Sequence, residues 1–298
     1  MTGTEDTRVV SGEGGIGTLL RAALPSLPGI GSLPGVRKSG RRFDGLSVTR
    51  PPVTVERDHV EAYAGVCGFP AKDTVPPTYP HLLAFPLHMA LMTDPTFPAP
   101  AIGTVHLENS LTQHRPVRVG ETLDVAASVA PPKPHPKGQV FEFVTTVRAA
   151  EPDGAGEIVW DSTSTYLRRG AGDAGASWGT EFPDVSPGAT VWRLPADLGR
   201  RYAAVSGDYN PIHLFGLTAK ALGFDRQIAH GMWTLARSVA ELENRLPDAV
   251  RIEAAFRKPV FLPGKVAFGS QPLDDGFAFT MTKPESHTVH LVGRTTSL

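Results

Sequence analysis

The sequence predicts an α+β protein built from two similar units, and three observations support this fold class. Two segments of the chain recur in the same order at nearly constant spacing. The 31 glycines and 28 prolines make up close to a fifth of the 298 residues, against about 12% in an average protein. This excess favours many turns and few long helices. A hydrophobic content of 41% still supports a buried core.

The internal repeat has two parts. Residues 63–69, Tyr-Ala-Gly-Val-Cys-Gly-Phe, match residues 202–208, Tyr-Ala-Ala-Val-Ser-Gly-Asp, at an offset of 139. Further along, residues 115–117 resemble residues 258–260 through an Arg/Lys-Pro-Val run at an offset of 143, and a glycine follows each run, Gly120 and Gly264. Two matches in order and at nearly one offset indicate duplication of a unit of about 120 residues.

In the first half, local patterns predict a few elements after a loosely organised N-terminal extension, residues 1–42. This extension includes one short predicted helix at 18–23. Alternating apolar residues predict strands at 139–147 and 158–167. The proline-rich segment 131–138 is predicted to be a loop, because proline is excluded from helix interiors and from central strands.

The second half follows a predicted linker, residues 170–188, which is rich in Gly, Ala, Asp and Ser. Short helices are predicted at 195–205 and 214–222. A longer helix is predicted at 232–246, where apolar residues step by three and four along the chain. The strands of this half are predicted at 250–256, 276–282 and 288–294.

Charge and cysteine content exclude several classes of protein. A net charge of −1 gives no global basic field, so we expect no nucleic-acid partner. The single cysteine, Cys67, excludes an intramolecular disulfide framework and favours a reducing cytoplasm. The longest apolar run, around 82–92, is far short of a membrane span, and no signal peptide opens the chain. We therefore expect a cytoplasmic protein that does not enter the membrane.

The segment with the most chemical information runs from Asp208 to His213. Asp208, Asn210 and Pro211 favour a turn, because Asx side chains bond to nearby backbone and proline fixes φ. An acid and an imidazole at the two ends of this turn suit proton transfer across one water. Residue types alone also allow a capped turn with a surface histidine, so both interpretations stay open at this point.

A second candidate is His230-Gly231-Met232, at the start of the long predicted helix. The first N–H groups of a helix lack intrahelical partners and carry partial positive charge. Glycine at such a place allows a ligand carbonyl to approach the N–H closely, as an oxyanion hole requires. An ordinary glycine near a helix start is the alternative.

Together these motifs resemble those of the MaoC-like dehydratases, which include the (R)-specific enoyl-CoA hydratases. The resemblance rests on residues 206–213, Ser-Gly-Asp-Tyr-Asn-Pro-Ile-His, and 229–232, Ala-His-Gly-Met. The repeat extends it more weakly over 43–298, and in detail the layout is similar to actinobacterial 3-hydroxyacyl-thioester dehydratases. The resemblance implies a double hotdog fold, two antiparallel sheets each wrapped around a long central helix. In the first half that helix corresponds to about 82–92.

The resemblance also implies a division of labour between the two copies. The N-terminal hotdog would span 43–170 and help to enclose the substrate, because Phe69 stands where the second copy has Asp208. The linker would span 171–188. The catalytic hotdog would then span 189–298.

The family's site residues map onto this sequence by their motif positions. Asp208 and His213 match the catalytic pair, Asn210 matches a residue that orders the site, and the Gly231 N–H would bind the thioester oxygen. The expected substrate-binding residues are Tyr209, His230, Met232, Phe69, Arg257 and Lys258. The implied reaction is reversible hydration of trans-2-enoyl thioesters to (R)-3-hydroxyacyl thioesters in fatty-acid metabolism. The resemblance implies no cofactor and no metal.

Several points stay open from the sequence. The substrate would carry its acyl group on coenzyme A or on acyl-carrier-protein pantetheine. Arg226 and Arg237 are further candidates for contact with coenzyme A phosphates, and a homodimer is an additional expectation. A hotdog acyl-CoA thioesterase and a non-catalytic acyl-thioester binding protein are the alternative functions.

Overall fold

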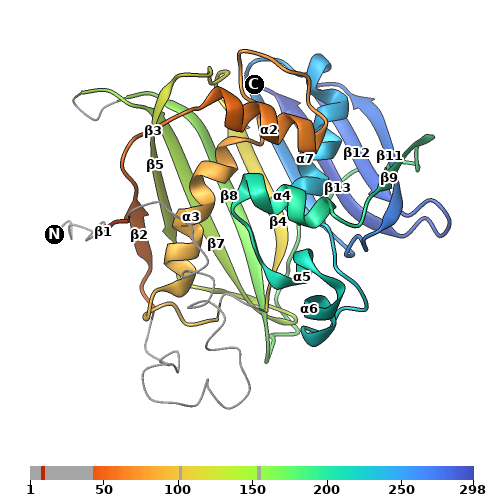
Figure 1. Cartoon of the computed structure of the whole chain (residues 1–298). Coiled ribbons are helices and arrows are strands. Elements are labelled where there is room, and N and C mark those ends of the chain that lie inside the picture. The colour runs from red at the N-terminus through yellow and green to blue at the C-terminus, as the bar shows by residue number, and fades with distance from the viewer. Residues whose placement is uncertain (1–7, 11–42, 101–102, 153–155) are drawn as a thin grey trace. The chain divides into compact units, whose positions relative to one another are not determined.

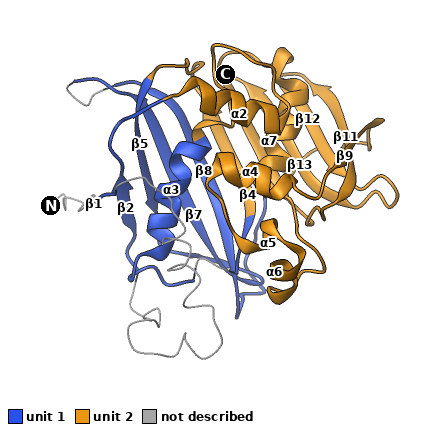
Figure 2. Ribbon diagram, in the orientation of Figure 1, with its two compact units in different colours: residues 1–54, 81–106, 122–179 blue, residues 55–80, 107–121, 180–298 orange. Residues whose placement is uncertain are grey.

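The structure is a computed structural model of the chain, and it describes residues 8–10, 43–100, 103–152 and 156–298. The helix predicted at 18–23 and most of the N-terminal extension lie outside these residues. Contacts divide the chain into two compact units (Figures 1 and 2). Unit 1 comprises residues 1–54, 81–106 and 122–179, and unit 2 comprises residues 55–80, 107–121 and 180–298. The boundaries predicted from the repeat follow chain order instead and remain a prediction.

Unit 1 is a sheet with one helix, α3, packed against it. The strands run in the order β1-β2-β5-β7-β8, with β3 paired to β5 and β6 to β7, and only the β1–β2 pair is parallel. In α3, His88 bonds to the Thr145 hydroxyl of β7 at 2.8 Å, which fixes this helix on the sheet. The bounds are β1 Arg8–Val9, β2 Leu46–Thr49, β3 Val53–Thr54, α3 Pro80–Thr93, β5 Thr122–Val129, β6 Lys133–His135, β7 Gly138–Ala149 and β8 Ile158–Arg169.

The strands predicted in unit 1 are confirmed, and one loop is corrected. The strands β7 and β8 contain the segments predicted at 139–147 and 158–167. The segment 131–138 includes a short strand, β6, which was predicted as loop. Its proline, Pro134, is tolerated because β6 pairs on one side only, with β7, and so lies at an edge of the sheet.

Unit 2 is an antiparallel sheet with the helices α2 and α4–α7. Its strands run in the order β4-β10-β13-β12-β11-β9. The long helix α7 packs against β12. The bounds are α2 Arg57–Cys67, β4 Thr104–Gln113 (in unit 2 from Leu107), β9 Thr190–Leu194, α4 Leu198–Ser206, α5 Pro211–Leu214, α6 Gly216–Ala221, α7 Gly231–Leu242 with a 3₁₀ turn Glu243–Arg245, β10 Val250–Phe256, β11 Gly264–Leu273, β12 Gly276–Thr282 and β13 Val289–Ser297.

The predicted helices of unit 2 form with small shifts, but the predicted turn at 208–213 is partly helical. The helices α4, α6 and α7 correspond to those predicted at 195–205, 214–222 and 232–246. Residues 211–214 form the helix α5, which the sequence analysis missed. Asn210 caps this helix through its side-chain oxygen, and proline at the first helical position has a preset φ.

The repeat appears in the structure as two helices that end in the same way. The helices α2 and α4 are each followed by a left-handed glycine, Gly68 with φ of 83° and Gly207 with φ of 73°. Each glycine N–H donates to an alanine carbonyl four residues back, Ala64 and Ala203, at 2.7 and 2.9 Å. Glycine adopts this conformation without strain, so both copies leave their helix in the same direction. No helix among the described residues is both long enough and apolar enough to cross a membrane.

Candidate active site

Hydrogen bonds to neighbouring residues of the chain hold Asp208 in the loop after α4. The Asp208 N–H donates to the Ser206 hydroxyl at 3.2 Å, and Asp208 Oδ1 accepts from the Asn210 N–H at 3.1 Å. Asn210 in turn caps α5 by accepting from the Ile212 N–H. The Asp208 side chain is 25% exposed. The Oδ1 atom of Asp208 therefore helps to order the loop. The other carboxylate oxygen, Oδ2, lies on the side of His230.

The catalytic candidate His213 lies in α5 with its tautomer fixed. Its Nδ1–H donates to the Ile228 carbonyl at 2.8 Å. Since a carbonyl only accepts, Nδ1 carries the proton, and in the neutral ring Nε2 carries the lone pair. Burial lowers the pKa of His213, and the Asp208 charge and the Ile228 carbonyl oppose this lowering. His213 is thus available as a neutral base at neutral pH.

His230 connects the two members of the pair. Its Nε2–H donates to the Asp208 backbone carbonyl at 2.9 Å and lies 3.9 Å from Asp208 Oδ2. Its ring stacks on that of His213, with centroids 3.7 Å apart, and contacts the tilted ring of Tyr202 at 4.8 Å. Burial and the neighbouring His213 lower the pKa of His230 well below its usual value. His230 is therefore a neutral donor between the acid and the base.

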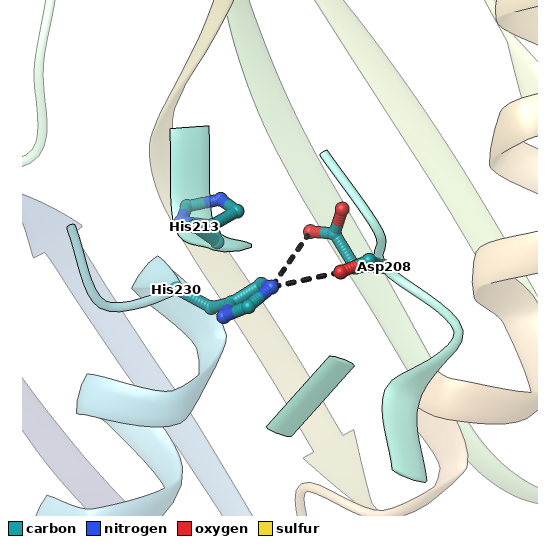
Figure 3. Close-up of side chains that lie close together, drawn as sticks. All are labelled: Asp208, His213 and His230. Carbon is teal, nitrogen blue, oxygen red and sulfur yellow. Dashed lines mark hydrogen bonds and ion pairs between the residues drawn. The ribbon is translucent and has the colours of Figure 1, made fainter. Parts of the chain in front are cut away.

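Figure 3 shows Asp208, His213 and His230 side by side, from the loop after α4, from α5 and from the start of α7. One ligand atom from each lies within 4.8 Å of the others, a spacing that would suit a metal ion. The stacking opposes this use, because a bound metal lies in the plane of each ring and the rings of His213 and His230 face each other. One nitrogen of each ring is also already bonded to a carbonyl. The donor set fits proton transfer better than metal binding.

Gly231 begins α7, where the first N–H groups have no intrahelical partner. A Cβ on Gly231 would lie 3.3 Å from the ring of Phe256, the last residue of β10. A side chain at this position would therefore crowd the Phe256 ring. The role expected of the Gly231 N–H, donation to a thioester oxygen, stays a prediction.

The remaining expected binding residues differ in their surroundings. Met232 is buried in α7, whereas Tyr209 is 38% exposed beside Asp208. Phe69 is buried and stacks on Tyr63 at 6.2 Å. Tyr63 contacts Tyr202, which contacts His230, so rings connect Phe69 to the site.

The basic candidates separate into two groups. Arg257 and Lys258 are exposed and directly follow Phe256, the neighbour of Gly231. Arg237 is engaged within the protein, because it pairs with Glu241 and lies over the Trp192 ring at 4.1 Å. Arg226 donates to the Pro263 carbonyl at 3.3 Å and lies over Phe261. Arg257 and Lys258 are therefore better placed to contact a ligand than Arg226 and Arg237.

Two residues that the sequence analysis missed tie the repeats together near the site. His59 in α2 donates from Nε2 to the carbonyl of Val205 in α4 at 2.8 Å. Trp233 in α7 donates to the carbonyl of Val66 in α2 at 3.0 Å. Val66 and Val205 occupy equivalent positions of the repeat, in helix last turns whose carbonyls lack intrahelical partners. The donors, His59 and Trp233, do not occupy equivalent positions of the repeat. A search for matching motifs therefore does not find these bonds.

Known proteins resemble this chain in sequence and in structure. The model of the MaoC like domain matches residues 183–289, and that of the FAS1-like dehydratase domain region matches residues 53–161. The 3-hydroxyacyl-thioester dehydratase X of Mycobacterium tuberculosis is 35% identical over 280 residues, 93% of this chain and 96% of its own length.

Solved structures extend the resemblance to the fold. The crystal structure of HtdX of Mycobacterium tuberculosis has a TM-score of 0.75 and 34% identity, covering 85% of this chain and all of its own. A conserved protein of the same organism, described as having a double hotdog fold, covers 86% of this chain and 96% of its own length. Its TM-score is 0.52 and its identity 14%. The predicted α+β double hotdog is thereby confirmed.

Proposed function

This chain belongs to the family of MaoC-like dehydratases, and we propose that Asp208 and His213 are its catalytic pair. The activity is that of a hydro-lyase, a 3-hydroxyacyl-thioester dehydratase, which removes water from a 3-hydroxyacyl thioester and adds it back reversibly. The observation that carries the residue assignment is the spacing of the two side chains. An imidazole nitrogen and a carboxylate oxygen within 4.8 Å can share one water, since two hydrogen bonds of about 2.8 Å bridge roughly 4–5 Å.

In the hydration direction, that water is the nucleophile. His213 Nε2 and the Asp208 carboxylate accept hydrogen bonds from the water, and its oxygen adds to C3 of the trans-2-enoyl thioester. The pair takes up one water proton and supplies one proton to C2, so the sum is one added water. Dehydration is the same path reversed. We assign the (R) configuration to the 3-hydroxyacyl product from the family resemblance.

The thioester carbonyl gains enolate character as C3 is attacked. The Gly231 N–H, at the start of α7, is the proposed donor to this oxygen. The helix dipole adds partial positive charge at the same point. Negative charge thus develops next to a donor that needs no rearrangement during the reaction.

The finer assignments belong to this proposal as well. Tyr209, Met232 and Phe69 would contact the acyl thioester, and Arg257 and Lys258 would meet phosphates of coenzyme A or of a carrier-protein pantetheine. We place the reaction in fatty-acid metabolism in the cytoplasm. Pairing of two chains is a further proposal.

A hydration assay with crotonyl-CoA and longer trans-2-enoyl-CoA substrates tests the function. We expect loss of the enoyl absorbance with the wild-type protein. Asp208→Asn and His213→Ala should each lose at least about a thousandfold in kcat, because the two groups act as a unit. Both variants should keep the wild-type melting temperature to within a few degrees.

Two results would contradict the proposal. Near-wild-type activity in either variant would refute the assignment of Asp208 and His213 as the catalytic pair. Release of free thiol, followed with a chromogenic reagent, would indicate a thioesterase, since hydration leaves the thioester intact.

A further inference from the structure

The helix α5, which carries His213, lies against the first turn of α4, and two contacts define this packing. The carbonyl of Leu214 accepts from the Arg200 guanidinium at 2.9 Å. The His213 carbonyl of α5 faces Gly199, which is buried in α4. Outside the two helices, Gln227 after α6 donates to the carbonyl of Ala196, which precedes α4, at 2.7 Å.

Gly199 makes this close approach possible. A Cβ built on Gly199 would lie 2.0 Å from the His213 carbonyl oxygen and 3.0 Å from its carbonyl carbon. Both are backbone atoms, so no flexible side chain could move aside. Gly199 is the second residue of α4 and has an ordinary negative φ, so the helix backbone itself does not require a glycine there. Space for the His213 backbone is therefore the reason for a glycine here.

The repeat supports this reading independently. Val60 in α2 is the equivalent of Gly199, three residues before the matched tyrosine in each copy. Val60 is buried, and residues 68–79 between α2 and α3 contain no helix. The first copy, which has no counterpart of α5, thus has valine at this position, whereas the second copy has Gly199.

We propose that Gly199 is a positioning residue of the dehydratase, which sets the depth at which α5 holds His213. The inference rests on the proposed function. A methyl group at residue 199 would push the His213 backbone outward by about 1 Å, because carbon–oxygen contacts closer than about 3 Å are not tolerated. The Nδ1–H bond to Ile228 would then lengthen or break. Misplacement on this scale costs about a hundredfold in rate.

The test compares Gly199→Ala with Gly65→Ala, a control in the equivalent helix. A Cβ on Gly65 meets nothing within 4 Å, and the repeat has Ala204 at that position. We expect kcat for enoyl-CoA hydration to fall about a hundredfold in Gly199→Ala with KM within about twofold. Nitrogen-15 NMR should show that His213 has lost its fixed Nδ1–H tautomer. Gly65→Ala should match the wild type in all three measurements.

Each outcome decides the matter. An inactive wild-type protein would refute the proposed function, and the His213 tautomer in Gly199→Ala would still decide this inference. An active wild type with a Gly199→Ala kcat within about twofold, or with the His213 tautomer unchanged, would overturn it. If Gly199→Ala does not fold, Arg200→Met removes the neighbouring bond to Leu214 without adding volume. Its kcat should then fall about tenfold at unchanged KM, and an unchanged kcat would overturn the inference.

Discussion

The imidazole of His230 lies face to face with that of His213, with centroids 3.7 Å apart and planes inclined by 26°. The same ring donates from Nε2 to the Asp208 carbonyl. His230 therefore touches both members of the proposed pair. Burial lowers the pKa of both rings, so the stack joins two neutral groups and carries no repulsion between charges at neutral pH.

Replacing His230 should lower kcat without abolishing it. His230→Phe keeps a ring against His213 but loses the hydrogen bond to Asp208, which is worth about 1 kcal/mol. We expect kcat to fall about fivefold at nearly constant KM, measured by enoyl-CoA hydration. His287→Asn is a suitable control, because His287 is exposed and asparagine tolerates its positive φ. An unchanged kcat in His230→Phe would show that the bond to Asp208 does not matter for the reaction.

The pH dependence of hydration should report His213. The reaction needs its neutral form, and burial places its pKa below the ordinary value of about 6.5. The acid limb of kcat/KM should therefore lie below about pH 6.5. Asp208 raises the pKa of His213, so Asp208→Asn should lower it further in a nitrogen-15 NMR titration. A rise of the His213 pKa in that variant would contradict the assignment.

The proximity of the candidate residues in the segment 208–213 was predictable from the sequence, because they are near neighbours in the chain, whereas the helix α5 was not. Asp208, Asn210 and His213 lie within six positions, and local capping brings them together. The part played by His230 was less visible. It depends on a backbone contact across 22 positions, which side-chain identities do not encode.

The fold was predictable where a pattern is local. Alternation identified β7, β8, β10 and β12 to within a few residues. The strands β1–β5, β9 and β11 were missed: β1, β3 and β9 are short, and β11 contains Gly269 and Pro272 among its apolar residues. The strands β9 and β11 pair with each other although about 70 residues separate them along the chain. Local sequence patterns do not contain such long-range pairing.

Acid should destabilise the protein through His88 of α3. His88 is fully buried, and burial together with His81 and His106 lowers its pKa well below the usual value. A lowered folded-state pKa means that the unfolded chain binds the proton first. Stability is therefore complete above about pH 6.5 and is lost below it, by about 1.4 kcal/mol per pH unit.

Urea unfolding at pH 7.5 and pH 5.5 measures this loss. His88→Leu combined with Thr145→Val removes the titrating ring and its hydroxyl partner together, so no buried polar group is left unpaired. The double variant should lose about 1.4 kcal/mol less than the wild type between the two pH values. His287→Asn should behave as the wild type. An equal loss in the double variant and the wild type would exclude His88 as the source.

The variant Gly231→Ala, compared with a double variant, should show whether Gly231 serves ligand access to its N–H or packing against Phe256. A methyl group there meets the Phe256 ring at 3.3 Å and also narrows the approach to the first N–H of α7. We expect kcat to fall about a hundredfold, the usual cost of losing one oxyanion donor. Phe256→Leu gives the methyl group room. If access to the N–H is the cause, the double variant Gly231→Ala/Phe256→Leu stays as slow as Gly231→Ala. Recovery of kcat in the double variant would instead assign the effect to packing against β10 and remove Gly231 from the proposed oxyanion site.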